Sequence, residues 1–195
     1  GTSFEYKQDL FFTPLIVLES EDLKTNTNAS TALKKQDGNY NNVELDYNFF
    51  YDKRDKTFRP TDGYYSSFDQ TLPLLSNDYS ISNKYDYRFY HKLSENMISN
   101  ISFHISAINS LEGSNVRVSD RLFLSSRKLR GFEPGKIGPK DNQDFIGGNY
   151  TSAMSFSSTL PSILPTMESI DFSLFIDAGN IWGVDYDSSL DNSKI

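Results

Sequence analysis

The side chains that could carry out chemistry in this chain are few and poorly arranged for it. The chain has no cysteine, which excludes thiolate nucleophiles and thiolate zinc sites, and its two histidines, His91 and His104, lack the spacing of a metal-ligand pair. Ser102 and Ser106 flank His104, but side chains two residues apart on a strand point the same way without touching. We therefore expect no metal, no cofactor and no enzyme. A hydrolase built on His104 and one of these serines is an alternative.

A basic segment, residues 126–146, is the other candidate for function. It combines lysines and arginines with glycines and prolines that fix turns, and it lacks the pattern of its neighbours. About twenty unpatterned residues inside a compact domain are usually functional or disordered, and this composition argues against disorder. If the segment folds back onto a polar surface, its cations would meet the carboxylates of Glu44, Asp46, Asp52, Asp171 and Asp177.

β-Strands must position this segment, because much of the chain alternates apolar and polar residues with a period of two. The alternation is strict in residues 43–52, 85–93, 101–107, 150–160 and 170–178, and weaker in 4–12, 64–72 and 118–125. Turn residues separate the runs, and no helical stretch lies between them, which excludes parallel βαβ folds. We predict an antiparallel all-β fold of about eight to ten strands, each of about ten residues, the length of a tilted membrane-spanning strand.

The two faces of the five strict runs indicate what surrounds them. One face holds no Asp, Glu, Lys or Arg, whereas the other carries eight charges in 21 positions. This division is typical of a transmembrane β-barrel with lipid outside and water inside, and tyrosines at the ends of the apolar stripe fit an interfacial girdle. A water-soluble β-sandwich that serves as a binding module shows the same alternation and is an alternative.

The charge balance excludes one class of partner. The 26 acidic residues outnumber the 19 basic ones, which gives a net charge of −7. Because nucleic-acid binding requires a basic surface, we expect no nucleic-acid partner. The longest uncharged run, residues 145–167, contains glycines and prolines, so it does not predict a transmembrane helix.

Four short segments resemble, in the right order, signatures of the BamA-type outer-membrane assembly factors of the Omp85 superfamily (bacterial surface antigen D15 superfamily). Residues 51–63 are similar to "YDxRD…PTxG", residues 129–140 to the "VRGF…IGPK" of the sixth extracellular loop, residues 144–149 to "DxxGGN", and residues 175–182 to "FxDAGNxW". Each match is weak alone, but four in order are specific. The positions that carry the match are Asp52, Arg54, Gly63, Arg130, Gly131, Phe132, Gly138, Pro139, Gly147, Gly148, Asn149, Asp177 and Gly179.

The resemblance implies an integral barrel of the Gram-negative outer membrane that folds and inserts other outer-membrane proteins. In the family this transmembrane barrel has about sixteen antiparallel strands, so the chain would be a fragment of it. The implied partners are the lipid bilayer, client β-barrel polypeptides and assembly-complex lipoproteins. Residues 1–195 correspond to the middle of the barrel domain, with residues 126–146 as the inward-folded sixth loop, and the POTRA domains and the first and last strands are not represented.

The resemblance also implies a role for the loop arginine. In the family this arginine packs inside the barrel against the aspartate of the "FxDAGN" strand, which corresponds here to Arg130 and Asp177. The family often supplies a second carboxylate from the "GGN" strand, at the place that aligns with Ser157 in this chain. A sister member of the superfamily that translocates or secretes a polypeptide through its pore shares these features and is the alternative function.

Overall fold

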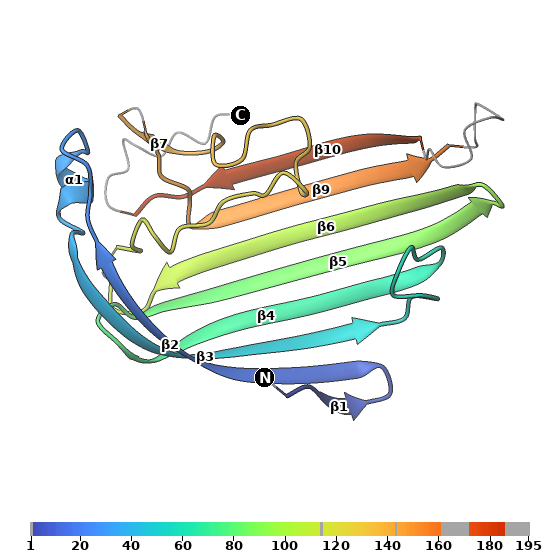
Figure 1. Cartoon of the computed structure of the whole chain (residues 1–195), viewed down its shortest axis with the longest axis horizontal. Coiled ribbons are helices and arrows are strands. Elements are labelled where there is room, and N and C mark those ends of the chain that lie inside the picture. Colours follow the sequence, from blue (N-terminus) through green and yellow to red (C-terminus); the bar gives the residue numbers. More distant parts are fainter. Residues whose placement is uncertain (1, 114, 143, 161–171, 186–195) are drawn as a thin grey trace.

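A computed structural model describes residues 2–113, 115–142, 144–160 and 172–185 of the chain. Eight antiparallel strands lie side by side in one curved sheet (Figure 1). In sheet order they are β1 (Phe4–Lys7), β2 (Leu10–Leu23), β3 (Gly38–Asp52), β4 (Gly63–Ser76), β5 (Ser80–Ser94), β6 (Met97–Ser110), β9 (Tyr150–Thr159) and β10 (Ser173–Trp182). The all-β antiparallel fold predicted from the alternating runs is confirmed.

The order of strands in the sheet follows their order in the chain. The largest insertion is the connection between β6 and β9, residues 111–149, which contains the two-residue strands β7 (Lys140–Asp141) and β8 (Asp144–Phe145). The connection between β2 and β3 carries a single helical turn, α1 (Thr31–Lys34), at the same end of the sheet as β7 (Figure 1). No helix among the described residues is long and apolar enough to cross a membrane.

Two of the weaker runs were interpreted wrongly from the sequence. Residues 4–12 are two strands joined by a tight turn at Asp9, where φ is 64°. The second of them, β2, continues through the unbroken apolar run 14–18, which strict alternation does not detect. Residues 118–125 form no strand and make one isolated bridge, Leu122 to Gly148, because their polar groups bond to turns and side chains instead.

Strand length also differs from the prediction. The ten-residue estimate fits β9 and β10, but β2 to β6 have 14 or 15 residues. Pairing of β2 with β3 continues past the apolar stripe through Glu21 and Asp22. Because ladder hydrogen bonds require no apolar side chains, the strands extend beyond the apolar band into a polar region.

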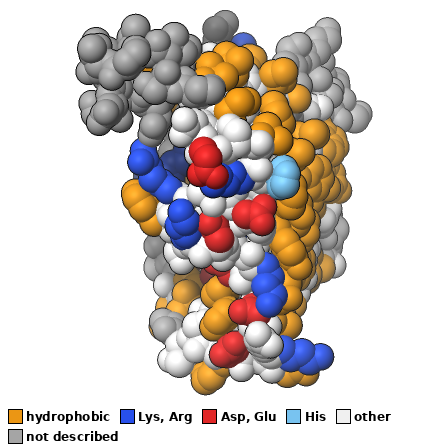
Figure 2. Space-filling model, turned by 90° about the vertical axis from the view of Figure 1, so that its right-hand side faces the viewer, with side chains coloured by type: hydrophobic (Ala, Val, Ile, Leu, Met, Phe, Trp, Pro, Cys, Tyr) orange, Lys and Arg blue, Asp and Glu red, His pale blue; other side chains and the backbone are white. Residues whose placement is uncertain are grey.

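The sheet exposes its apolar side chains and buries its polar ones, which is the reverse of a water-soluble sandwich. On β6 the apolar Ile101, Phe103 and Ile105 are 40%, 40% and 43% exposed, whereas the intervening His104 and Ser106 are 6% and 5% exposed. Seen from the end of the sheet at the right of Figure 1, hydrophobic side chains form a band along one side, and charged and polar ones gather beside it (Figure 2). The apolar face has no protein cover among the described residues, as expected of a lipid-facing surface.

A small hydrophobic cluster fixes the 111–149 segment to the polar face of the sheet. Leu124, Leu129 and Ile137 from this segment pack with Ala153 of β9 and Ile181 of β10, and all five are nearly inaccessible to solvent. These contacts place the charged groups of the same segment against β5, β6, β9 and β10.

Candidate functional site

The residue pair indicated by the sequence resemblance is the first anchor of the loop. Arg130 donates from Nε to Asp177 Oδ2 over 2.8 Å and from Nη2 to Oδ1 over 2.6 Å, and its backbone N–H donates to Oδ2 over 2.9 Å. The Asp177 side chain is 2% exposed and that of Arg130 is 33% exposed. The guanidinium also lies 3.8 Å from the centroid of the Phe175 ring. A bidentate, charge-assisted contact of this kind fixes both position and orientation.

The strand register explains the remaining contact of this arginine. Asp177 on β10 lies directly opposite Ser155 on β9, so both side chains emerge on the polar face. Arg130 Nη2 donates to Ser155 Oγ over 2.7 Å. Ser157, which aligns with the family's second carboxylate, pairs with Phe175, two residues further along the ladder, and as a serine it supplies no carboxylate to Arg130.

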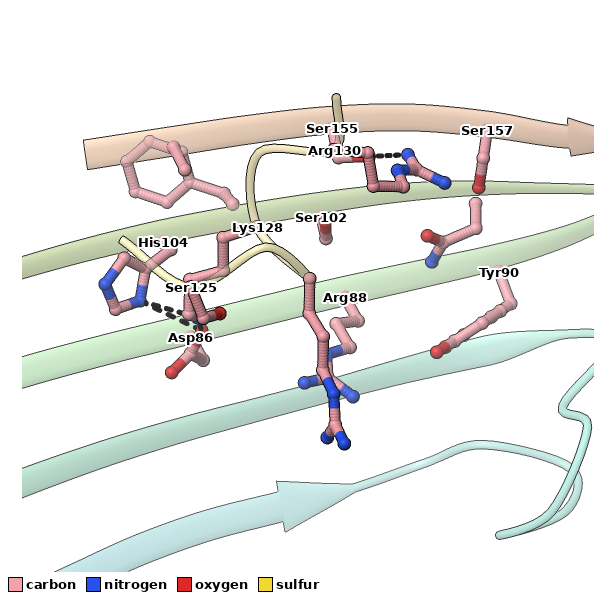
Figure 3. A pocket seen from close by; sticks show the side chains of 14 residues that line it. Asp86, Arg88, Tyr90, Ser102, His104, Ser125, Lys128, Arg130, Ser155 and Ser157 are labelled. Atoms are coloured by element: carbon pink, nitrogen blue, oxygen red, sulfur yellow. Dashed lines mark hydrogen bonds and ion pairs between the residues drawn. The ribbon is translucent and has the colours of Figure 1, made fainter. Parts of the chain in front are cut away.

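A second anchor, which the sequence did not reveal, lies two residues before the first. Lys128 Nζ forms a salt bridge with Asp86 of β5 and lies 2.9 Å from His104 Nδ1 of β6 (Figure 3). His104 Nδ1 is 3.0 Å from Asp86 Oδ1, and Thr151 Oγ1 of β9 is 3.3 Å from His104 Nε2. No local pattern distinguishes Asp86 or Lys128 from the other charged residues of the chain, because their encounter depends on tertiary packing.

The two anchors together bridge four strands. Asp86 lies on β5 and Asp177 on β10, which are three strand spacings apart, or about 14 Å. Two residue steps cover at most about 7 Å even when extended, and this segment is turned, so the long Lys128 and Arg130 side chains span the rest. Short side chains at either position would not reach.

The far end of the insertion is fixed by two buried arginines that sequence reasoning also missed. Arg121, whose side chain is fully buried, donates to Asn149 Oδ1 over 2.9 Å, to Val116 O over 3.0 Å and to Asp185 Oδ1 over 2.5 Å. Burial alone would raise the pKa of Asp185, but hydrogen bonds from the Val116 N–H and Asn149 and the charge of Arg121 outweigh it, and the net pKa is below the usual range.

Arg117 joins this insertion to the neighbouring ends of β2 and β3. Its guanidinium forms salt bridges with Glu21 at 3.2 Å and Asp120 at 2.9 Å and lies 4.4 Å from the Tyr40 ring centroid. Burial raises the pKa of Asp120, although the neighbouring Arg117 opposes that rise. The sequence signal for this cluster is a pair of arginines four residues apart, Arg117 and Arg121, but the alternation in residues 118–125 predicts a strand there instead.

The motif glycines allow close approach between the insertion and the sheet. A Cβ at Gly148 would overlap the Trp182 carbonyl oxygen, one at Gly138 would lie 2.8 Å from Ile181 Cβ, and one at Gly179 would lie 2.9 Å from Leu124 Cδ1. Such distances exclude larger residues unless the backbone shifts.

The other glycine-motif residues lie beside these contacts. Pro139 is fully buried next to Gly138, and Asn149 donates from Nδ2 to Asp185 Oδ2 over 3.0 Å. A Cβ at Gly147 would lie 2.8 Å from the Leu122 carbonyl oxygen. These residues therefore hold the insertion against the end of the sheet.

The tip of the loop is less buried than its arginine. Gly131 has a φ of 85°, which turns the chain directly after the anchor, and Phe132 remains 49% exposed. Within the described part of the chain, Arg130 is the residue of the Arg-Gly-Phe motif that hydrogen-bonds to the sheet.

The first motif forms a separate turn between β3 and β4. Arg54 and Asp52 make a bidentate contact of 2.7 and 2.8 Å. Gly63, with φ of 94°, begins β4 where a Cβ would overlap the Lys53 carbonyl. Hydrogen bonds from Thr61 lower the pKa of Asp55 to about 2.

The loop cations do not meet most of the carboxylates that were expected to receive them. Of the five named from the sequence, only Asp177 bonds to the 126–146 segment within the described residues, and Asp171 lies outside them. Asp52 forms its salt bridge with Arg54. The loop cation Lys128 pairs with Asp86, which was not among the five. Net charge indicated attraction, but strand register decided which carboxylate lay within reach.

The arrangement around His104 does not match a hydrolase site. Its ring bonds to Asp86 and Thr151, and Ser106 donates instead to the Asn83 carbonyl over 3.2 Å. Thr151 is 1% exposed, so its hydroxyl is inaccessible to a substrate. The geometry supports positioning of a loop by hydrogen bonds and ion pairs.

Comparisons with known proteins agree with this architecture. A family model described as the Omp85 superfamily domain matches residues 14–194. A SAM50-like protein of Schizosaccharomyces pombe is 33% identical over 165 residues, covering 78% of this chain and 34% of the relative. The crystal structure of BamA from Haemophilus ducreyi lacking POTRA domains 1–3 has a TM-score of 0.80 at 18% identity, covering 93% of this chain and 40% of that chain.

These figures define what the likeness shows. The chain spans about a third of the curated relative and two fifths of the solved structure. At 18% identity the structural likeness concerns the fold, and it confirms that the curved eight-stranded sheet is part of a larger β-barrel.

Proposed function

Because this chain belongs to the Omp85 superfamily, we propose that the protein containing it folds and inserts β-barrel proteins into an outer membrane. The observation that carries the proposal is the double anchorage of the loop on the polar face, through Arg130 to β10 and Lys128 to β5. Both anchors consist of ion pairs and hydrogen bonds, and we propose that the protein acts by a non-enzymatic mechanism.

Family membership confirms two expectations from the sequence. The four motif segments did indicate the correct family, and members of this family are integral outer-membrane β-barrel proteins. The exposed apolar face described above is the surface that such a protein presents to lipid.

The proposed mechanism separates a rigid wall from an openable edge. The loop ties β5, β6, β9 and β10 into one unit, so this part of the barrel resists deformation. Strand edges elsewhere in the barrel would then open and pair with a client strand, because unpaired N–H and C=O groups recruit another strand. Local disturbance of the lipid would lower the barrier to insertion.

Depletion of the full-length protein tests this function against its alternative. Loss of many outer-membrane β-barrel proteins is the result expected of an assembly factor. Loss of one secreted polypeptide, with the membrane proteins retained, would instead identify the translocating pore, which uses the same loop arginine and strand aspartate.

Complementation links that phenotype to the anchors. Wild-type protein and a Glu133→Gln variant should restore the β-barrel proteins, since Glu133 is 66% exposed and its salt bridge within the described residues is with the exposed Lys136. Asp177→Asn should restore them poorly. A Ser106→Ala variant, which alters neither anchor, should restore full assembly if the mechanism is non-enzymatic, and a measured hydrolysis abolished by that variant would overturn the non-enzymatic mechanism.

The proposed partners are the bilayer, client β-barrel polypeptides and assembly-complex lipoproteins. Purification of the full-length protein under mild detergent, followed by mass spectrometry, identifies the accessory subunits. Lipid-modified N-terminal cysteines in these subunits are the expected result, whereas accessory subunits that lack lipid anchors would contradict the lipoprotein assignment.

A further inference from the structure

The cavity beneath the loop carries more positive charge than its own carboxylates neutralise. It has a volume of about 460 Å³ and is lined by β5, β6, β9 and the loop (Figure 3). Four cationic side chains line it, and Asp86 is the single carboxylate among its described lining residues. The cations are Arg88, Arg127, Lys128 and Arg130.

Two of the four cations are already paired. Lys128 forms its salt bridge with Asp86, and Arg130 forms its own with Asp177. Within the part of the chain that the structure describes, neither Arg88 nor Arg127 makes a salt bridge, and both side chains are exposed. In a chain with a net charge of −7, two accessible guanidinium groups on one cavity therefore remain without a protein counter-charge.

The walls of the cavity also offer neutral donors beside these arginines. Ser102 of β6 lies opposite Arg88 in the strand ladder, and Ser157 of β9 lies opposite Asn100 of β6. The hydroxyls of Ser102 and Ser157 make no hydrogen bond with another described residue, so both can donate to a ligand. Guanidinium forks combined with hydroxyl donors match the oxygen atoms of a carboxylate.

We propose that this cavity binds an acidic segment of a polypeptide, with Arg88 and Arg127 as the residues that recognise its carboxylates. The volume is within the range of natural ligand sites. The two arginines belong to different elements, β5 and the loop, so a chain carrying more than one carboxylate can contact both. The choice of a polypeptide rests on the proposed function, in which client chains pass close to this wall.

Binding of a defined probe to the purified full-length protein tests the site. The probe is a fluorescein-labelled aspartate-rich peptide, its matched control is the same peptide with every aspartate replaced by asparagine, and fluorescence anisotropy measures the dissociation constant. We expect Arg88→Gln and Arg127→Gln each to weaken binding about tenfold. Lys136→Gln removes one positive charge from the same loop outside the cavity, and it should change the affinity less than twofold in comparison.

Three outcomes would overturn the proposal: equal binding of the asparagine peptide, unchanged binding by both arginine variants, or arginine-dependent binding of inorganic phosphate without binding of the peptide. The last would assign the site to small free anions. Heat-modifiable electrophoretic mobility shows that each variant barrel is folded. Because binding is measured on the purified protein, failure of the depletion experiment would refute the assembly function without altering this result.

Discussion

Removal of the carboxylate at Asp177 should release the loop from the sheet. The Asp177 side chain is 2% exposed and accepts three hydrogen bonds from Arg130. Asp177→Asn replaces this charged acceptor with a neutral one. Breaking one partner of a buried ion pair costs about 3–5 kcal/mol. Arg130 is 33% exposed, so water recovers part of that loss, and we expect about 2–3 kcal/mol.

Hydrogen exchange at the Leu129 amide measures this cost. Leu129 is 3% exposed and its N–H donates to the Ser125 carbonyl, so the reporter does not contact the altered side chain. If its exchange requires the loop to lift, a loss of about 2–3 kcal/mol accelerates exchange about 30- to 160-fold.

Glu133→Gln is the matched control for this measurement. It removes one negative charge from the exposed loop without touching either anchor, so exchange at Leu129 should remain within about twofold of wild type. If the Leu129 amide of Asp177→Asn exchanged at the wild-type rate, the reasoning would be refuted, because the loop would then be held without the Asp177 carboxylate.

Three further changes probe the remaining contacts. Lys128→Met leaves Asp86 without its lysine, and we expect about tenfold faster exchange at Leu129; unchanged exchange would rule out a second anchor. Gly148→Val places a side chain against the Trp182 carbonyl, and the overpacking should cost about 1–3 kcal/mol and lower the thermal unfolding temperature. An unfolding temperature equal to that of wild type would contradict the close approach. The depressed pKa of Asp55, about 2, means that its stabilisation of the β3–β4 turn is complete above the ordinary aspartate pKa and is lost as the pH falls towards 2. Pepsin should therefore cut residues 53–62 faster at the acid end of this window, and Asp55→Asn should remove the pH dependence; equal pH dependence in both proteins would exclude Asp55 as its source.

The sequence was informative wherever one local pattern had one physical meaning. Strict alternation identified the strands around Phe49, Phe89 and Phe103, since a period of two places every second side chain on one face. It failed in β2, where residues 14–18 are apolar on both faces, and in residues 118–125, where alternation occurs without a neighbouring strand to pair with.

For the site, the sequence determined the charged partners, and tertiary structure determined which of them meet. Arg130 and Asp177 were available from the family resemblance, but Ser155, Asp86 and Lys128 became neighbours only through the ladder register and the packing of the 111–149 segment. A salt bridge requires two groups within about 4 Å, and no local rule specifies distance between residues tens of positions apart.

The chain by itself thus determines two faces, one apolar and one charged, because side-chain direction on a strand depends only on position along it. Curvature of the sheet, the inward position of the loop and the choice of Asp86 over Glu44 or Asp46 depend on how eight strands align together. A shift of one residue in that alignment would move every one of these carboxylates to the opposite face.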